Sequence, residues 1–185
     1  MTTRDRWAEW LLQRRHGGDP ERRQEMVAHL AGVRDSVLDR AELAAGDTVL
    51  DVGCGDGLIA FGAIDRVGPD GKVIFSDVSA ELLGVCRQQA VEIGVMDCCE
   101  FVQASADGLD AVADGSVDAI TTRSVLIYVG DKSACFHEFY RVLRTGGRLS
   151  VFEPINGYPL WEADNTYCGY DVGPVAELSA KLTAV

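Results

Sequence analysis

The segment Val49-Leu50-Asp51-Val52-Gly53-Cys54-Gly55-Asp56-Gly57 decides the fold of this chain of 185 residues. Apolar residues run into three glycines at alternate positions, and a helical pattern begins directly after them. This order is typical of a buried strand, a tight turn and a helix start. Glycines let the backbone come close to a ligand, and the first turn of a helix offers unpaired N–H groups. We therefore expect a ligand site at this turn.

Two kinds of cofactor suit a glycine turn of this kind. A dinucleotide would call for the pattern G-x-G-x-x-G around its pyrophosphate, but Leu58 occupies the position of the third glycine. Asp51 and Asp56 flank the turn, and their carboxylates would repel a pyrophosphate but attract an ammonium and a sulfonium. The segment therefore favours S-adenosyl-L-methionine over NAD.

Strand and helix patterns alternate after residue 48. We expect strands at 48–51, 72–77, 100–103, 117–122 and 148–152, and helices at 58–67, 79–94 and 131–143, the last of them stopped by Gly146-Gly147. Strands separated by helices form a parallel sheet with helices on both faces, and ligands bind beyond the carboxyl ends of the strands. The predicted fold class is α/β, a Rossmann-like three-layer sandwich with a mostly parallel central sheet.

Two helical patterns precede the first strand. Trp7, Trp10 and Leu11 mark a short helix, and Pro20 opens a longer one that Gly46-Asp47 ends. We predict an N-terminal helical cap over residues 1–46 and a cofactor-binding domain over residues 47–185. The two tryptophans either close over the cofactor or pack in the interior.

Asp77 closes the second predicted strand. A carboxylate at this position can accept hydrogen bonds from both hydroxyls of a ribose, as it does in dinucleotide-binding folds. The alternative is that Asp77 only caps the helix that follows, although Ser79 is itself a good N-cap.

Three segments together resemble class I S-adenosylmethionine-dependent methyltransferases. Residues 49–57 are similar to the first motif of that family, residues 117–120 to its fourth strand, and residues 138–148 to the helix and turn before its fifth strand. The resemblance covers residues 48–153 and is closest to the subgroup that methylates small molecules, the quinone- and sterol-type enzymes.

The resemblance implies a role for particular residues. Asp51, Gly53 and Gly55 would surround the methionine part of the cofactor, Asp77 would bind its ribose, and Val78 would pack on its adenine. The predicted cofactor-binding set is completed by Cys54, Ser105, Ala106 and Arg123. Ser105 stands where the family often has an aspartate that binds the adenine amine, and Asp107 is the alternative acceptor. Ala106 would offer its backbone N–H to the adenine ring.

The sequence says less about the residues that would contact the acceptor substrate than about those that would bind the cofactor. A base is optional in methyl transfer, because the cofactor carries the difficult chemistry. Tyr128, Glu153 and Asn156 are candidates near the strand ends. Glu153 is the strongest as a catalytic residue, and its alternative role is an ion pair with Arg123 or Arg148. The aromatic segment 158–170 is either a lid over an apolar ligand or part of the packing.

Charge, apolar runs and cysteine spacing exclude or disfavour several classes of function. The formal net charge is −12, and the whole acidic excess lies after residue 46, so a nucleic-acid substrate is disfavoured. The sequence shows no apolar run long enough for a membrane span and no secretory signal, so we expect a cytoplasmic location. Six cysteines show no metal-ligand spacing, and we expect free thiols and no metal.

Only about thirty residues follow Glu153, whereas the family's sheet gains two further strands there. We expect either a short form or a chain that lacks these last two strands. The predicted function is methyl transfer from S-adenosylmethionine to an O, N or C atom of a small-molecule acceptor. The alternatives are a methyltransferase-like binding module without turnover and, third, an NAD-dependent oxidoreductase.

Overall fold

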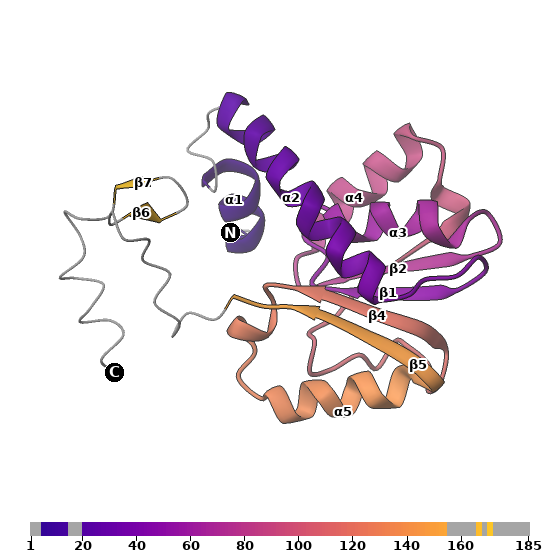
Figure 1. The fold of residues 1–185 in the computed structure, drawn as a ribbon. Helices are drawn as coiled ribbons and strands as arrows, with labels where there is room; N and C mark the ends of the chain where they lie inside the picture. Colours follow the sequence, from indigo (N-terminus) through magenta and orange to yellow (C-terminus); the bar gives the residue numbers. More distant parts are fainter. Residues whose placement is uncertain (1–4, 15–19, 155–165, 168–169, 172–185) are drawn as a thin grey trace. The chain divides into compact units, whose positions relative to one another are not determined.

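A parallel sheet forms the centre of the fold in the computed structural model, which describes residues 5–14, 20–154, 166–167 and 170–171 and, for residues 20–29, the backbone alone. Its strands are β1 (Thr48–Val52), β2 (Lys72–Asp77), β3 (Cys99–Gln103), β4 (Val117–Arg123) and β5 (Leu143–Phe152). Their order in the sheet is β3-β2-β1-β4-β5, and every pair of neighbours in it is parallel (Figure 1). The order reverses direction at β1 and β4, which is the point where such sheets bind ligands.

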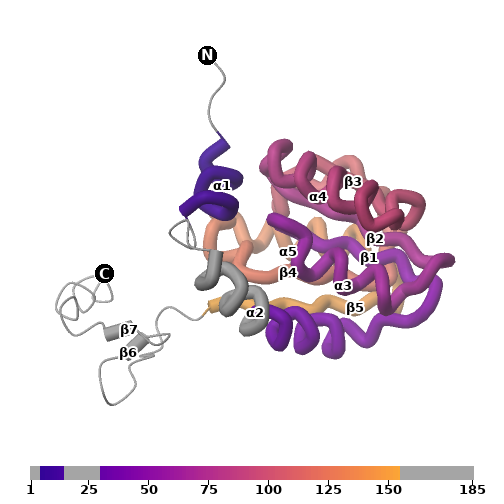
Figure 2. The backbone as a smooth tube through the Cα atoms, turned by 90° about the horizontal axis from the view of Figure 1, so that it is seen from above, coloured from indigo at the N-terminus to yellow at the C-terminus, as the bar shows by residue number. Residues whose placement is uncertain are grey.

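Helices cover both faces of this sheet (Figure 1). On one face lie α2 (Pro20–Arg40), α3 (Leu58–Val67) and α4 (Ala80–Glu92), and on the other lies α5 (Lys132–Val142). Figure 2 shows α1 (Arg6–Glu9) on the side of the sheet where the strands end, and the π-helical turn Trp10–Arg14 follows it. The three-layer α/β architecture predicted from the sequence is confirmed.

The alternation of side chains along the strands divides the core into two clusters. Val49 and Phe75 face α3 and α4, while Leu50 and Ile120 face α5. Successive residues of a strand point to opposite faces, so a strand buried on both sides reads as a continuous apolar run. This is why the predicted strands were recognisable as short apolar segments.

Local capping follows the sequence closely. The hydroxyl oxygen of Ser79 accepts the N–H of Leu82 at 3.0 Å, and Asp131 accepts the N–H of Ala134 at 2.9 Å. Both residues were predicted as N-caps, and both predictions are confirmed.

The predicted end of the last helix is wrong. Helix α5 ends at Val142, and Leu143 already has extended backbone angles as the first residue of β5. Gly146-Gly147 therefore lies inside the strand, at an irregularity of its pairing with β4. Pairing with the neighbouring strand outweighs the helical pattern that continues through Leu143. Similarly, α2 ends at Arg40, before the predicted Gly46-Asp47.

The chain divides into two compact units, residues 1–153 and 154–185. Within the second, β6 (Thr166–Tyr167) pairs antiparallel with β7 (Tyr170–Asp171). A domain boundary at residue 46 stays a prediction, and Asn156 lies outside the described residues. Among the helices that the structure describes, none is long and apolar enough to cross a membrane.

The packing around Phe75 yields a stability prediction. Its ring is fully buried and lies 5.0 Å from the rings of both Phe61 and Phe101. We expect Phe75→Ala to lower the free energy of unfolding by about 3–5 kcal/mol, because it leaves a cavity in the core. Tyr140→Ala is the control, since that side chain is 85% exposed and should change stability by about 0.5 kcal/mol or less. Equal effects in urea denaturation would contradict this account of the core.

Candidate functional site

A cavity of about 370 Å³ lies at the carboxyl ends of β1, β2 and β4. This volume falls within the range of small-molecule sites, about 300–1,000 Å³. All nine residues predicted to bind the cofactor line it: Asp51, Gly53, Cys54, Gly55, Asp77, Val78, Ser105, Ala106 and Arg123. Tyr128 lines it as well, together with Trp7 and Trp10 from the N-terminal segment. The topology thus brings together residues that are more than a hundred positions apart.

The glycine turn can exist only with glycine at its decisive positions. Gly53 and Gly57 have φ angles of +68° and +87°, in the left-handed region. A Cβ at Gly53 would lie 2.3 Å from a methyl carbon of Val125, and one at Gly57 would lie 2.5 Å from the ring of Phe61. Both the backbone angles and the lack of space therefore exclude a side chain at positions 53 and 57, and the backbone stays close to the cavity.

Asp77 ties this turn to the end of β2. Its Oδ2 accepts the N–H of Gly55 at 2.9 Å, and its Oδ1 accepts the N–H of Ser79 at 2.9 Å. The side chain is only 7% exposed, and burial raises the pKa of Asp77. Asp77 thus shapes both the turn and the start of α4, and each oxygen keeps a lone pair for a ligand hydroxyl.

Asp51 is the second buried carboxylate of the cavity. It is 2% exposed, and its Oδ1 accepts the hydroxyl of Thr121 at 2.8 Å. Burial raises the pKa of Asp51 to about 7, although the Thr121 hydrogen bond and the charge of Arg123 oppose that shift. A cation in the cavity would stabilise the ionised form of this carboxylate.

Ser105 and Asp107 meet on the side of the cavity that follows β3. The Ser105 hydroxyl donates a hydrogen bond to Oδ1 of Asp107, and both residues line the cavity. Val78 follows the end of β2, the strand next to β3, and 47% of its surface is exposed. The two acceptors that the sequence offered as alternatives therefore form one hydroxyl–carboxylate pair.

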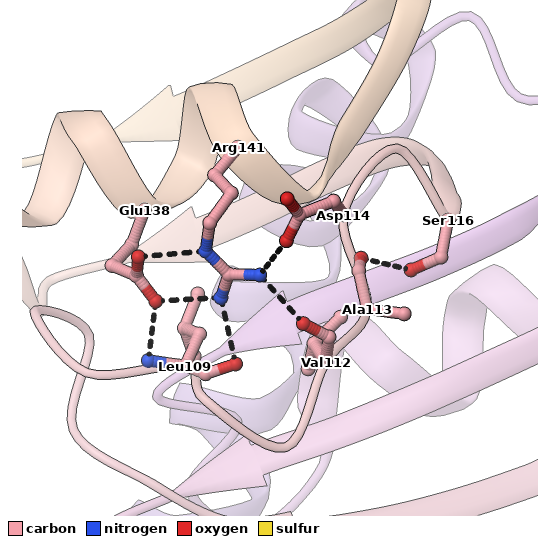
Figure 3. Close-up of polar contacts among 7 residues, drawn as sticks. All are labelled: Leu109, Val112, Ala113, Asp114, Ser116, Glu138 and Arg141. Carbon is pink, nitrogen blue, oxygen red and sulfur yellow. Dashed lines mark hydrogen bonds and ion pairs between the residues drawn. The ribbon is translucent and has the colours of Figure 1, made fainter.

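An ion pair on α5 holds the loop that carries these residues, as Figure 3 shows. Glu138 accepts the N–H of Leu109 at 2.8 Å, and Arg141 donates to the carbonyls of Leu109 at 3.0 Å and Val112 at 2.9 Å. Arg141 also donates to Asp114 at 2.6 Å. The hydrogen bond from Arg141 lowers the pKa of Glu138 to about 2. We call these contacts of Glu138 and Arg141 the clamp on α5. It was not predicted from the sequence, where its only local signal was a Glu and an Arg three residues apart on a helix.

Glu153 has backbone partners rather than a place on the cavity wall. Its Oε1 accepts the N–H groups of Val125 at 2.7 Å and Leu126 at 2.9 Å, and Oε2 accepts that of Ile127 at 3.4 Å. The carboxylate thereby caps the 3₁₀ turn Leu126–Tyr128. Its catalytic role stays a prediction, and its contacts hold the backbone of the turn that ends at Tyr128.

The side chain of Arg148, one of the two arginines suggested as ion-pair partners for Glu153, instead donates to Asp47.

The N-terminal helix borders the cavity through two contacts. Asp5 accepts the hydroxyl of Ser79 at 2.6 Å, directly after the end of β2. The ring of Trp7 lies edge-on to that of Tyr128, with 4.9 Å between ring centroids. α1 therefore connects the ends of two strands beside the cavity, and these partners were beyond the reach of sequence analysis.

No cluster of three or more metal-binding side chains occurs among the residues that the structure describes. Five cysteines in that part of the chain are free thiols: Cys54, Cys86, Cys98, Cys99 and Cys135. The expectation of free thiols is confirmed for these five.

The strand order and the structural neighbours show the Rossmann-like fold of class I methyltransferases, and the family model confirms the resemblance found in the sequence. The chain belongs to the ubiE/COQ5 methyltransferase family, whose model matches residues 28–172.

The relatives support this assignment. The ubiquinone/menaquinone biosynthesis C-methyltransferase UbiE of Hahella chejuensis is 40% identical over 116 residues, which cover 63% of this chain and 46% of that protein. A SAM dependent methyltransferase from Aquifex aeolicus shares the fold, with a TM-score of 0.65, 22% identity and 87% of each chain covered.

A geranyl diphosphate C-methyltransferase from Streptomyces coelicolor A3(2) was solved with S-adenosyl-L-homocysteine bound. Its TM-score is 0.63 at 26% identity, with 75% of this chain and 51% of that one covered. The chain spans about half the length of the curated relatives it matches.

The clamp on α5 leads to a prediction about local stability. We expect Arg141→Gln to lower the free energy of unfolding by about 1–3 kcal/mol, because it leaves the carbonyls of Leu109 and Val112 without their donor. Amide hydrogen exchange should accelerate in residues 104–114. The control is Arg66→Gln, because the Arg66–Asp39 ion pair is exposed and should contribute about 1 kcal/mol or less. Unchanged exchange in the loop would show that Arg141 does not hold it.

Asp51 yields a prediction about pH. Its folded-state pKa of about 7 lies above the ordinary value of 3.8, so between these pH values the folded chain retains a proton that the unfolded chain releases. Stability therefore falls as pH rises from about 4 to about 7 and levels off above. We expect this slope to be smaller in Asp51→Asn, measured by urea denaturation across the range. Identical pH profiles would contradict the assigned pKa.

Proposed function

We propose that the chain binds S-adenosyl-L-methionine in this cavity and transfers its methyl group to a small-molecule acceptor. The observation that carries the proposal is the pair of buried carboxylates, Asp51 and Asp77, on either side of a glycine turn that leaves no room for side chains. Family membership supports the same cofactor.

The charge of the cavity fits this cofactor better than a dinucleotide. Among the described residues that line it, four are aspartates and two are arginines. A net negative lining opposes a pyrophosphate and attracts a ligand that carries an ammonium and a sulfonium. The proposal therefore favours S-adenosylmethionine over NAD, and the comparisons offer no support for a module without turnover.

When bound, S-adenosylmethionine would supply an electrophilic methyl group, to which an acceptor nucleophile would bond in line as the methyl–sulfur bond breaks and S-adenosylhomocysteine leaves. The chain's own residues bind and orient. We assign Asp51 and the backbone of Gly53 and Gly55 to the amino-acid part, and Asp77 to the ribose hydroxyls. Arg123 lies near Asp51 and balances its charge.

The remaining assigned residues lie on the adenine side of the cavity. Val78 offers an exposed apolar surface for the ring, while Ala106 and the Ser105–Asp107 pair supply its polar contacts. Cys54, in the glycine turn, lines the cavity as well.

The acceptor side of the cavity is aromatic. Trp7, Trp10 and Tyr128 line it, and flat apolar surface of this kind suits a planar apolar ligand. The names of the relatives refer to C-methylation in ubiquinone and menaquinone biosynthesis, and we propose an acceptor of similar character. Tyr128 remains the candidate to accept a proton, and we propose a cytoplasmic location for the reaction.

Calorimetry tests the cofactor. We expect S-adenosylmethionine and S-adenosylhomocysteine to bind and NADH not to bind. Asp77→Ala should weaken the binding of both by about 1–3 kcal/mol, because ribose hydroxyls and the N–H of Gly55 lose their acceptor. Asp70→Ala is the matched control, since Asp70 is an exposed aspartate at the opposite end of β2. Preferential binding of NADH would overturn the proposal.

A second measurement tests the acceptor side. With a quinone-type acceptor and radiolabelled cofactor, we expect Trp7→Ala to raise the acceptor KM about tenfold or more, as loss of an aromatic anchor costs about 2 kcal/mol. Cofactor affinity should change little. Tyr128→Phe retains the ring and removes the hydroxyl, so a lower kcat in this variant would support a proton-accepting role. An unchanged acceptor KM in Trp7→Ala would remove the aromatic wall from the acceptor site.

A further inference from the structure

Two thiols from different elements converge on one backbone oxygen of the glycine turn. The Sγ atom of Cys86, on α4, donates to the carbonyl of Gly55 at 3.4 Å, and the Sγ atom of Cys54, in the turn itself, lies 3.9 Å from the same oxygen. The neighbouring Cys86 thiol also has the largest influence on the Cys54 thiol, whose pKa it raises. The two thiols thus lie against the same carbonyl oxygen although the residues are 32 positions apart.

The two thiols differ in their access to solvent. Cys54 is 6% exposed and lines the cavity, so a small solute in the cavity can reach it. Cys86 is fully buried behind the turn, where its Sγ would lie 3.2 Å from a Cβ placed on Gly57. A solute in the cavity can therefore react with the thiol of Cys54. The buried thiol of Cys86 lies behind it, where it can react with an oxidised Cys54.

We propose that Cys54 and Cys86 form an oxidation site in which a hydroperoxide converts the two thiols into a disulfide across the glycine turn. The peroxide transfers one oxygen atom to the sulfur of Cys54, giving a sulfenic acid and, from hydrogen peroxide, water. The sulfur of Cys86 then attacks that of Cys54, the S–S bond forms, and a second water leaves. Two electrons pass from the thiol pair to the peroxide.

The surroundings of Cys54 keep its thiol protonated. The neighbouring Cys86 thiol, burial, and the charges of Asp51 and Asp77 all raise the pKa of the Cys54 thiol well above its usual value. Because the thiolate is the reactive form, oxidation is slow at neutral pH and accelerates as pH rises.

Oxidation and occupation of the cavity exclude each other. A ligand seated on the glycine turn covers Cys54 and shields it from peroxide. Conversely, a disulfide draws the turn toward α4 and fixes Cys54 away from its position in the reduced chain. This coupling rests on the proposed function, whereas formation of the disulfide does not.

The other described cysteines lack this arrangement. Cys98 and Cys99 are adjacent, but their thiols contact different carbonyls, those of Pro69 and Val95. Cys135 is buried on the opposite face of the sheet, in the cluster around α5. Cys135→Ser is therefore a matched control for Cys86→Ser, since both substitutions replace a fully buried helical cysteine.

The test treats the free chain with hydrogen peroxide at about pH 7 and about pH 9. We expect a loss of about 2 Da, the two hydrogen atoms of a disulfide, and a faster reaction at the higher pH. Trypsin separates the two cysteines at Arg66 and Lys72, so a cross-linked peptide pair identifies the bond. Cys86→Ser should lose the cross-link and gain oxygen at Cys54 instead, and Cys135→Ser should behave as the parent chain.

A second arm tests the coupling with S-adenosylhomocysteine. At about ten times its Kd the ligand leaves about one tenth of the chain free, so the cross-link should form about tenfold more slowly. The oxidised chain should bind the ligand more weakly, and dithiothreitol should restore binding. A cross-link in a chain that does not bind this ligand would count against the proposed function alone. Absence of the Cys54–Cys86 cross-link, or its formation at an unchanged rate with the ligand bound, would overturn the inference.

Discussion

The hydrogen bond from the N–H of Gly55 to Asp77 connects the two strand ends on which the cavity depends. Glycine at positions 53 and 57 permits a left-handed backbone that no side chain would tolerate at this spacing. Such a turn is flexible in isolation, because glycine loses more conformational freedom on folding than any other residue. The carboxylate at the end of β2 fixes the turn in place, and the same carboxylate orients the start of α4 through Ser79.

The cost of this arrangement is the burial of negative charge. Asp51 and Asp77 both have raised pKa values because they are withdrawn from water. Arg123 offsets part of the charge of Asp51, and a positively charged ligand would relieve the rest of this cost. Burial of these two carboxylates lowers the stability of the chain without a ligand, and for the same reason it favours the binding of a cation. This links the geometry of the turn to the class of cofactor.

Sequence reasoning succeeded where the determining contacts are local. The glycine turn, the caps at Ser79 and Asp131, and the strands around them depend on residues within a few positions of each other. The predicted cofactor residues meet in one cavity because parallel strands bring their carboxyl ends to a common edge. The roles of the individual residues came from the resemblance to class I methyltransferases.

Sequence reasoning failed where the partner lies far along the chain. Glu138 binds the N–H of Leu109, Glu153 binds that of Val125, and Asp5 accepts the hydroxyl of Ser79, 74 positions away. The backbone partners of Glu153 could not be read from the sequence, so its contacts with the turn Leu126–Tyr128 were missed, while its catalytic role stays a prediction. Leu143 was assigned to a helix because its pattern is apolar and only pairing with β4 reveals the strand.

A crystal structure of the chain soaked with S-adenosyl-L-homocysteine tests the central claim most directly. The account predicts the ligand in the cavity beside Gly53, with its amino-acid part near Asp51 and both ribose hydroxyls within hydrogen-bonding distance of Asp77. Density for the ligand elsewhere, or a ribose turned away from Asp77, would contradict it.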